Sequence, residues 1–172
     1  GIATDWQAML EDGAEASPIN PLRVQRVLPS DVPPEVGPLF ITWRETFSYL
    51  KRMGVSPGRS VLIIGNGGNG LAFVSHARNL GAAPVVLVGA ANRREDGLRA
   101  GATAFVDYRA SDAWDHVRLS APEGYDFVVD AVGKADSVAQ GQKCLKEGGT
   151  LGIYGLDECG KITLSPGRTF TY

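Results

Sequence analysis

Three glycines, Gly65, Gly67 and Gly70, are the residues of this 172-residue chain whose spacing is best suited to chemistry. They form the pattern G-x-G-x-x-G, directly after the apolar run VLII and directly before a stretch with helical periodicity. The first glycine permits a tight turn, the second lets a pyrophosphate approach the backbone, and the third lets the helix pack closely on a sheet. The free N–H groups at the start of that helix attract phosphate. The pattern therefore predicts a dinucleotide-binding loop.

This glycine loop, residues 65–70, also contains Gly68 and two asparagines, Asn66 and Asn69. Asparagine tolerates turn geometry, so both side chains could serve only the conformation of the loop. Their amides could equally donate hydrogen bonds to a phosphate. The sequence leaves both roles open, and all six residues of the loop are candidates for cofactor binding.

Apolar strands alternate with helical stretches from residue 61 onward, which is typical of a parallel sheet with right-handed crossovers. Strands are expected over 61–64, 85–88, 104–106, 127–130 and 150–154. Helices are expected over 71–80, 95–100, 113–119 and 137–146, with Gly148 and Gly149 ending the last one. The prediction is an α/β fold of the Rossmann type, a doubly wound parallel sheet with strand order 3-2-1-4-5.

The first part of the chain differs in composition, since six of its prolines lie between residues 18 and 38. We expect a connecting segment over 1–38, within which the alternating pattern of residues 22–28 predicts an edge strand. Apolar residues at helical spacing over 39–53 predict a helix that leads into a cofactor domain of residues 39–172. Because the chain begins at glycine rather than methionine, we expect it to be a segment of a larger protein.

Composition and charge exclude several classes of function. A formal net charge of -2 with scattered basic residues gives no general attraction to nucleic acid or to a membrane surface. No stretch has the length of a membrane span or the form of a signal peptide, so we expect a cytoplasmic protein. Cys144 and Cys159 lack metal spacing, and we expect free thiols, with Cys144 buried. We expect His76 and His116 to be packing or surface residues, and no metal site in this chain.

The order of four segments resembles the medium-chain dehydrogenase/reductase superfamily, which includes zinc-dependent alcohol dehydrogenases and quinone reductases. The segments, which cover most of residues 29–155, are FSYLKRMGVSPGRSVLIIGNGGNGLAFVSHARNLGA, RAGATAFVDYR, YDFVVDAVG and LKEGGTLGIYG. The resemblance implies an NAD(P)-binding Rossmann domain whose catalytic domain, with the cysteine, histidine and glutamate ligands of the zinc-dependent branch, lies outside this chain. It also implies that the cofactor domain is truncated before its last strand.

The end of the second strand bears on the choice of cofactor. NAD-preferring domains carry an acidic residue there, which binds the adenosine ribose, whereas this chain has Gly89 and no carboxylate nearby. Arg93 and Arg94 follow and could contact a 2′-phosphate through their guanidinium groups. NADP(H) is therefore favoured over NAD(H). The alternative is that both arginines are solvated at the start of a helix.

By resemblance, the residues after the fourth and fifth strands flank the nicotinamide ring and its ribose. These candidates are Ala131, Val132, Gly133, Tyr154 and Gly155. Glu45 stands where many relatives place a threonine close to the nicotinamide, which leaves that contact open between a proton relay and an exposed helical glutamate. Asp107 and Tyr108 could touch the adenine, or serve as a cap and a packing residue.

The resemblance implies hydride transfer between an alcohol and a carbonyl compound, with a small-molecule substrate and a homo-oligomer at full length. No catalytic residue is assigned here, zinc would belong only to the missing domain, and we expect the isolated fragment to be inactive. One alternative is the domain of a zinc-free NADPH quinone or enone reductase. Others are a non-catalytic dinucleotide-binding sensor and an adenosyl-methionine methyltransferase, whose glycine loop also follows its first strand.

Overall fold

The computed structural model of the chain describes residues 11–13 and 28–157. The chain separates into two compact units, residues 1–39 and 40–172. In the first unit the described residues form turns, in which the Val32 N–H donates to the Pro29 carbonyl and the Val36 N–H to the Pro33 carbonyl, at 3.0 and 2.9 Å. The expected edge strand, apart from its last residue, and Cys159 lie outside the described residues.

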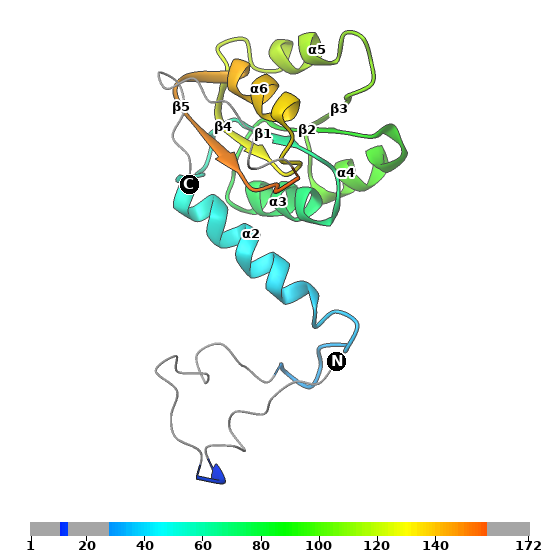
Figure 1. Cartoon of the computed structure of the whole chain (residues 1–172), viewed down its shortest axis with the longest axis vertical. Helices are drawn as coiled ribbons and strands as arrows, with labels where there is room; N and C mark the ends of the chain where they lie inside the picture. The colour runs from blue at the N-terminus through cyan, green and yellow to red at the C-terminus, as the bar shows by residue number, and fades with distance from the viewer. Residues whose placement is uncertain (1–10, 14–27, 158–172) are drawn as a thin grey trace. The chain divides into compact units, whose positions relative to one another are not determined.

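The second unit is built on a five-stranded parallel sheet with order β3-β2-β1-β4-β5, which confirms the predicted fold (Figure 1). The strands are β1 (Val61–Ile64), β2 (Val85–Gly89), β3 (Ala104–Asp107), β4 (Tyr125–Asp130) and β5 (Leu145–Ile153). The helices are α2 (Leu39–Met53), α3 (Gly68–Asn79), α4 (Arg94–Ala100), α5 (Ala113–Leu119) and α6 (Ala135–Lys143), with a short 3-10 helix η2 (Ala91–Arg93).

Helices cover both faces of the sheet, with α2, α3 and α4 against one face and α5 and α6 against the other (Figure 1). Alternate residues of β1 pack against the helices on opposite faces of the sheet. Val61 and Ile63 pack in a cluster with Phe73 of α3, while Leu62 and Ile64 pack in a second cluster with Val117 and Val138, from α5 and α6. All four residues of β1 are buried. The uninterrupted apolar run is explained by this double burial, as expected for a parallel sheet.

The last helix and strand differ from the sequence prediction. Helix α6 ends at Lys143, and β5 begins at Leu145, ahead of the glycine pair. Tyr125 pairs with Leu145 but Phe127 pairs with Thr150, so a short excursion interrupts the register of β5. Gly148 and Gly149 lie in this bulge, where Gly148 takes a positive φ of 73°. The prediction that they end a helix was wrong, because a glycine pair also suits a bulge within a strand.

One edge of the sheet, where β1 and β4 begin, carries a saturated polar cluster. The amide and hydroxyl of Ser60 donate to Asp126 Oδ2 at 3.0 and 3.1 Å, and Arg59 Nη1 and Lys146 Nζ lie 3.0 and 3.5 Å from Oδ1. Burial acts to raise the pKa of Asp126, but the Ser60 hydrogen bonds and the two cations outweigh it and hold that pKa below its usual value. This cluster fixes the start of β1 against the start of β4.

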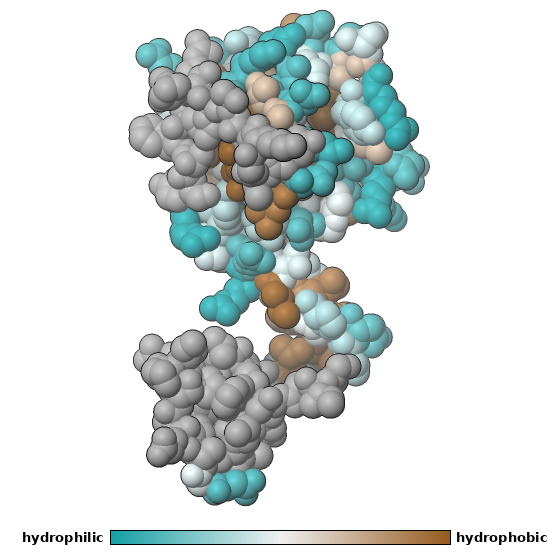
Figure 2. Space-filling view, in the orientation of Figure 1, coloured by the Kyte–Doolittle hydropathy of each residue, from teal (hydrophilic) through white to brown (hydrophobic). Residues whose placement is uncertain are grey.

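Exposed apolar side chains gather on the amino-terminal half of α2 (Figure 2). Within the second unit, Ile41 is 74% exposed, and Phe40, Trp43 and Phe47 are each about two-fifths exposed. The carboxyl-terminal half is different, because Tyr49, Leu50 and Met53 are buried in the core. The carboxyl-terminal end of α2 is therefore packed into the core, while apolar side chains nearer its amino end keep part of their surface exposed.

Candidate cofactor-binding site

The glycine loop connects the end of β1 to the start of α3, and two of its glycines are required by geometry. Gly65 has φ of 106°, which favours glycine, and its N–H donates to the Val88 carbonyl at 2.8 Å. A Cβ at Gly70 would lie 1.8 Å from the Gly65 carbonyl oxygen. The first turn of α3 therefore rests directly on the backbone of the loop.

The other glycines leave the start of α3 open. A Cβ at Gly67 or at Gly68 would meet no atom within 4 Å. Gly67 is the N-cap of α3, no side chain caps the helix, and its first turn contains no acidic residue. The N-cap residue therefore supplies no side-chain hydrogen bond to the N–H groups that begin this helix of twelve residues. This arrangement fits a pyrophosphate, which such groups bind through hydrogen bonds and the helix dipole.

Asn66 turns its side chain away from α3 and toward the end of β2. Its Nδ2 donates to the Ala90 carbonyl at 2.8 Å, while Arg93 Nη1 donates to the Asn66 backbone carbonyl at 3.4 Å. A Cβ at Gly89 would lie 2.2 Å from Asn66 Cγ. The structure therefore brings the predicted residues 66, 89 and 93 together. Asn69 differs from Asn66, since it lines the cleft described below.

The two predicted arginines have different surroundings. Arg93 lies in η2, is exposed, and reaches the glycine loop through Asn66. Arg94 begins α4, and its Cζ lies 5.7 Å from the centre of the Phe105 ring. This is the range of a cation–π contact. Arg93 is therefore the arginine whose guanidinium is held at the loop.

The segments after β4 and β5 meet backbone to backbone. A Cβ at Gly133, which has φ of 83°, would lie 2.3 Å from the Gly155 carbonyl carbon, and a Cβ at Gly155 would lie 2.2 Å from the Gly133 nitrogen. Gly65 joins them to the glycine loop, because its Cβ position is 3.0 Å from Val132 Cγ2. The predicted residues 131–133 and 154–155 thus lie at one edge of the sheet together with the loop.

Asp130, which was not among the predicted site residues, organises this edge. It is fully buried, its carbonyl accepts the N–H groups of Tyr154 and Gly155 at 2.8 and 3.0 Å, and its Oδ2 accepts the Gly133 N–H at 2.7 Å. Oδ1 is buried without a hydrogen-bond partner. Burial raises the pKa of this carboxyl, although the Ser137 hydroxyl acts in the opposite direction. The signal in the sequence is a lone carboxylate that ends an apolar strand.

An open cleft of about 560 Å³ lies above these segments. Its lining combines α2, the glycine loop and the ends of β4 and β5, through Glu45, Tyr49, Arg52, Asn69, Ala131, Val132, Ile153, Tyr154, Gly155 and Leu156. Its size is that of a small-molecule site. The cleft lies beyond the carboxyl ends of the strands and beside the switch point between β1 and β4, where ligands bind in doubly wound folds.

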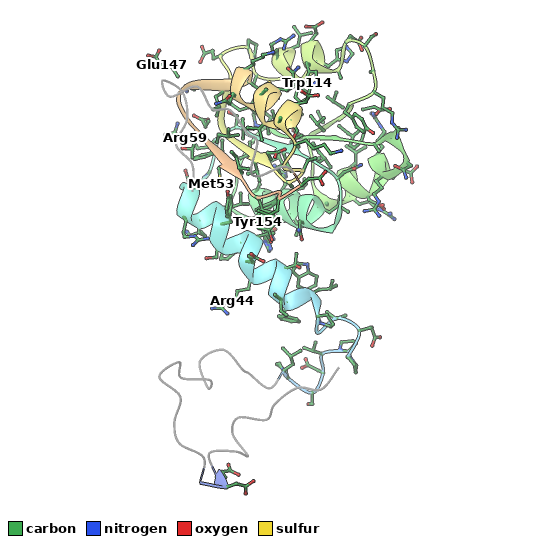
Figure 3. All side chains as sticks on the ribbon, viewed as in Figure 1. Arg44, Met53, Arg59, Trp114, Glu147 and Tyr154 are labelled. Carbon is green, nitrogen blue, oxygen red and sulfur yellow. The ribbon has the colours of Figure 1, made fainter. Side chains whose placement is uncertain are left out.

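Tyr154 and Glu45 form a polar pair in the wall of this cleft. Burial raises the pKa of Tyr154, and a hydrogen bond from its hydroxyl to the Glu45 carboxylate raises it further. The Tyr154 ring lies 4.9 Å from that of Phe73 and 5.5 Å from that of Tyr49, between α2 and α3 (Figure 3). Glu45 is therefore an exposed residue that lines the cleft.

The remaining candidates have structural partners. Asp107 Oδ1 accepts the Arg109 N–H at 3.1 Å, and the Tyr108 N–H donates to the Gly89 carbonyl at 3.2 Å. His76 packs edge-on against Phe47, and burial lowers its pKa. Cys144 is buried and unpaired by a disulfide. Within residues 11–13 and 28–157, no group of three or more His, Cys, Asp and Glu side chains could hold a metal ion, and no helix is long and apolar enough to cross a membrane.

Known proteins share both the sequence and the architecture of this chain. The family model for zinc-binding dehydrogenases matches residues 68–171. An NADP-dependent alcohol dehydrogenase C of Mycolicibacterium smegmatis is 33% identical over 137 residues, which cover 80% of this chain and 37% of that protein. D-arabinitol dehydrogenase 1 of Uromyces fabae is 32% identical over 127 residues, which cover 70% of this chain and 36% of that protein.

Two solved structures show the same arrangement. A protein described as a zinc-binding dehydrogenase from Sinorhizobium meliloti 1021, solved with NADP bound, has a TM-score of 0.73 and 32% identity. The match covers 81% of this chain and 42% of that one. An alcohol dehydrogenase from Thermus sp. ATN1 has a TM-score of 0.77 at 24% identity, over 86% of this chain and 45% of that one, and supports the fold alone. The chain thus spans less than half the length of these proteins.

Proposed function

Because this chain belongs to the zinc-binding dehydrogenase family, we propose that it is the NADP(H)-binding domain of an oxidoreductase that interconverts alcohols and carbonyl compounds. The broader statement, a dinucleotide-binding domain of an alcohol dehydrogenase-like oxidoreductase, follows from the family itself. The choice of NADP(H) depends on one observation. At the end of β2 the chain has a glycine without space for a side chain, and the exposed guanidinium of Arg93 is held beside it.

The residues of the site divide the cofactor between them. The amides at the start of α3 would bind the pyrophosphate, and Gly67 and Gly68 leave room for its oxygens. Arg93 would pair with the 2′-phosphate, since a guanidinium suits a phosphate in charge and shape. The cleft between Glu45 and Val132 would take the nicotinamide half. When bound, NADP(H) supplies the hydride chemistry, and this domain supplies binding and orientation.

The substrate-binding part lies beyond these residues in this proposal. The chain spans 36–37% of the length of the two curated relatives, which is about the share of one domain. A zinc ion, if the protein is of the zinc-dependent branch, would be held by residues outside the described ranges. The whole protein would act on a small alcohol or its carbonyl counterpart, as the names of its relatives indicate for those proteins.

Titration of the chain with NADPH, NADH and adenosyl-methionine, followed by calorimetry, tests the proposal. We expect NADPH to bind at least about fivefold tighter than NADH. Arg93→Ala should weaken NADPH about tenfold and leave NADH within about twofold, because only NADPH carries the 2′-phosphate. Arg94→Ala is the matched control, since its guanidinium packs on Phe105, and it should have a smaller effect. Equal losses for both nucleotides, or binding of adenosyl-methionine alone, would contradict the proposal.

A further inference from the structure

We propose that Asn66 determines cofactor specificity in this domain, by filling the space that an acidic side chain at position 89 would need and by holding the guanidinium of Arg93 beside that space. The inference rests on the proposed function, because it concerns the adenosine ribose of a dinucleotide. It goes further in assigning the selectivity to a residue of the glycine loop rather than to the end of β2. The ligand it selects is an adenosine ribose with a 2′-phosphate.

Asn66 fills the space beside Gly89 that a side chain at position 89 would need. Gly89 is buried at the last position of β2 and has no positive φ, so its backbone could carry any side chain. A Cβ there would nevertheless lie 2.2 Å from Cγ, 2.5 Å from Cβ and 2.5 Å from Nδ2 of Asn66. These distances are far inside van der Waals contact. The glycine at the end of β2 is therefore required by Asn66 and not by the strand.

Two hydrogen bonds, one from the Asn66 side chain and one to its backbone, hold Asn66 in place. Its Nδ2 donates to the Ala90 carbonyl at 2.8 Å, across 24 positions of sequence. Its own carbonyl accepts Arg93 Nη1 at 3.4 Å. One residue thus connects the glycine loop to both the segment after β2 and the arginine. The side chain cannot rotate away from Gly89 without losing the bond to Ala90.

The groups at the end of β2 determine which adenosine ribose can bind beside them. A ribose with a free 2′-hydroxyl needs an acceptor at the end of β2, usually a carboxylate. Asn66 excludes a carboxylate at position 89, and the group it places nearby is a cation. A dianionic 2′-phosphate gains from that cation and would be repelled by a carboxylate. The Asn66 side chain therefore disfavours the diol, and the Asn66 backbone carbonyl, which accepts the hydrogen bond from Arg93, favours the phosphate.

A cycle of variants of the chain tests this assignment. Asn66→Gly removes the whole obstructing side chain, Gly89→Asp introduces the carboxylate, and the double variant combines them. Asn66→Ala with Gly89→Asp is the matched control, because alanine removes the amide but keeps the Cβ at 2.5 Å. The measurements are the thermal unfolding midpoint and the dissociation constants of NADH and NADPH from fluorescence titration.

We expect Gly89→Asp alone to lower the unfolding midpoint by about 5 °C or more, or to prevent folding, because two side chains then compete for one volume. The Asn66→Gly background should restore the midpoint to within about 2 °C of Asn66→Gly itself, and the alanine background should not. In the rescued double variant NADH should bind about tenfold tighter than in Asn66→Gly, and NADPH about tenfold weaker.

Three results would overturn the inference. They are wild-type stability of Gly89→Asp, no rescue of its stability by the Asn66→Gly background, and NADH binding no tighter in a rescued double variant than in Asn66→Gly. The proposed function fails separately. If the wild type bound NADH and NADPH equally and Arg93→Ala changed nothing, the NADP(H) preference would be lost. The stability cycle would still report whether Asn66 blocks position 89.

Discussion

The two ends of β4 present the same chemical group in opposite surroundings. Asp126, at the amino end, has hydrogen bonds from Ser60 and charges from Arg59 and Lys146, and its pKa lies below the usual value. Asp130, at the carboxyl end, is buried with one oxygen unpaired, and burial raises its pKa. Polar groups at the first edge are satisfied by the protein. At the second edge, no N-cap side chain satisfies the N–H groups that begin α3.

This difference distinguishes residues that stabilise the fold from residues that we propose to bind the cofactor. Glycines divide in the same way. Gly70 is needed because a Cβ there would overlap the backbone of the loop, whereas a Cβ at Gly67 would meet no neighbouring atom within 4 Å. A substitution at each kind of position should therefore affect stability at one and cofactor binding at the other.

Gly70→Ala should destabilise the domain by about 3 kcal/mol and abolish measurable NADPH binding, because its Cβ would overlap the Gly65 carbonyl and push α3 off the loop. Urea unfolding and calorimetric titration measure the two effects. Gly67→Ala is the control in the same loop. Its free energy of unfolding should change by less than about 1 kcal/mol, while NADPH binds at least about tenfold weaker. Equal loss of stability in both variants would remove the contrast.

Asp126→Asn should lower the free energy of unfolding at pH 7 by about 1–2 kcal/mol, because it weakens charge-assisted hydrogen bonds from Ser60. The native pKa of Asp126 is lowered, so its carboxylate stabilises the fold above the unfolded pKa of about 3.9. The difference between variant and wild type should shrink as the pH falls below about 4. Affinity for NADPH should not change, and a clear loss would place Asp126 in the site.

Asp130→Asn should have the opposite dependence on pH. A raised native pKa means that the wild type loses stability as the pH rises from about 4 through that pKa, because the buried carboxyl must ionise. Asparagine keeps an acceptor for the Gly133 N–H and carries no charge. We expect the variant to gain stability relative to the wild type over that range, on the order of 1 kcal/mol. Urea unfolding at pH 4 and pH 7 checks the sign, and a loss that grows with pH would refute it.

Glu45→Gln should give the smallest effect, a change in preference between the oxidised and reduced nucleotides. Under the proposed function the nicotinamide lies in the cleft that Glu45 lines, and its oxidised ring carries a positive charge. Removing one nearby carboxylate should weaken NADP+ roughly threefold relative to NADPH. Glu147→Gln, in the bulge of β5, is the control with the same loss of charge. An equal change for both nucleotides would show that the carboxylate does not act on the ring.

Local sequence was sufficient to predict elements with an unbroken apolar run or with apolar residues at a regular helical spacing. The apolar run of β1 and the periodic helix α2 have the predicted bounds. The carboxyl end of α6 was predicted too far along, because Cys144 and Leu145 continue an apolar pattern and Gly148 resembles a helix stop. Only the partner strand decides between a helix end and a bulge, and that partner is twenty residues away in sequence.

The sequence predicted which segments lie together at the candidate site, but not which side chains contact one another there. The glycine loop and the segments after β4 and β5 lie together, as the strand order requires. The different surroundings of Arg93 and Arg94 depend on where Phe105 and Asn66 lie, which no pattern of neighbouring residues encodes. The importance of Asp130 was missed for the same reason, because its role is a set of hydrogen bonds to the segments that follow β4 and β5.

The contact between Gly133 and Gly155 has a consequence for anyone who wishes to redesign this domain. Each glycine lies where the other's backbone would collide with any side chain, at 2.3 and 2.2 Å. The two segments should therefore be exchanged together. A chimera that takes one loop from a relative and keeps the other native should express poorly, whereas one that transplants both segments together preserves the fit.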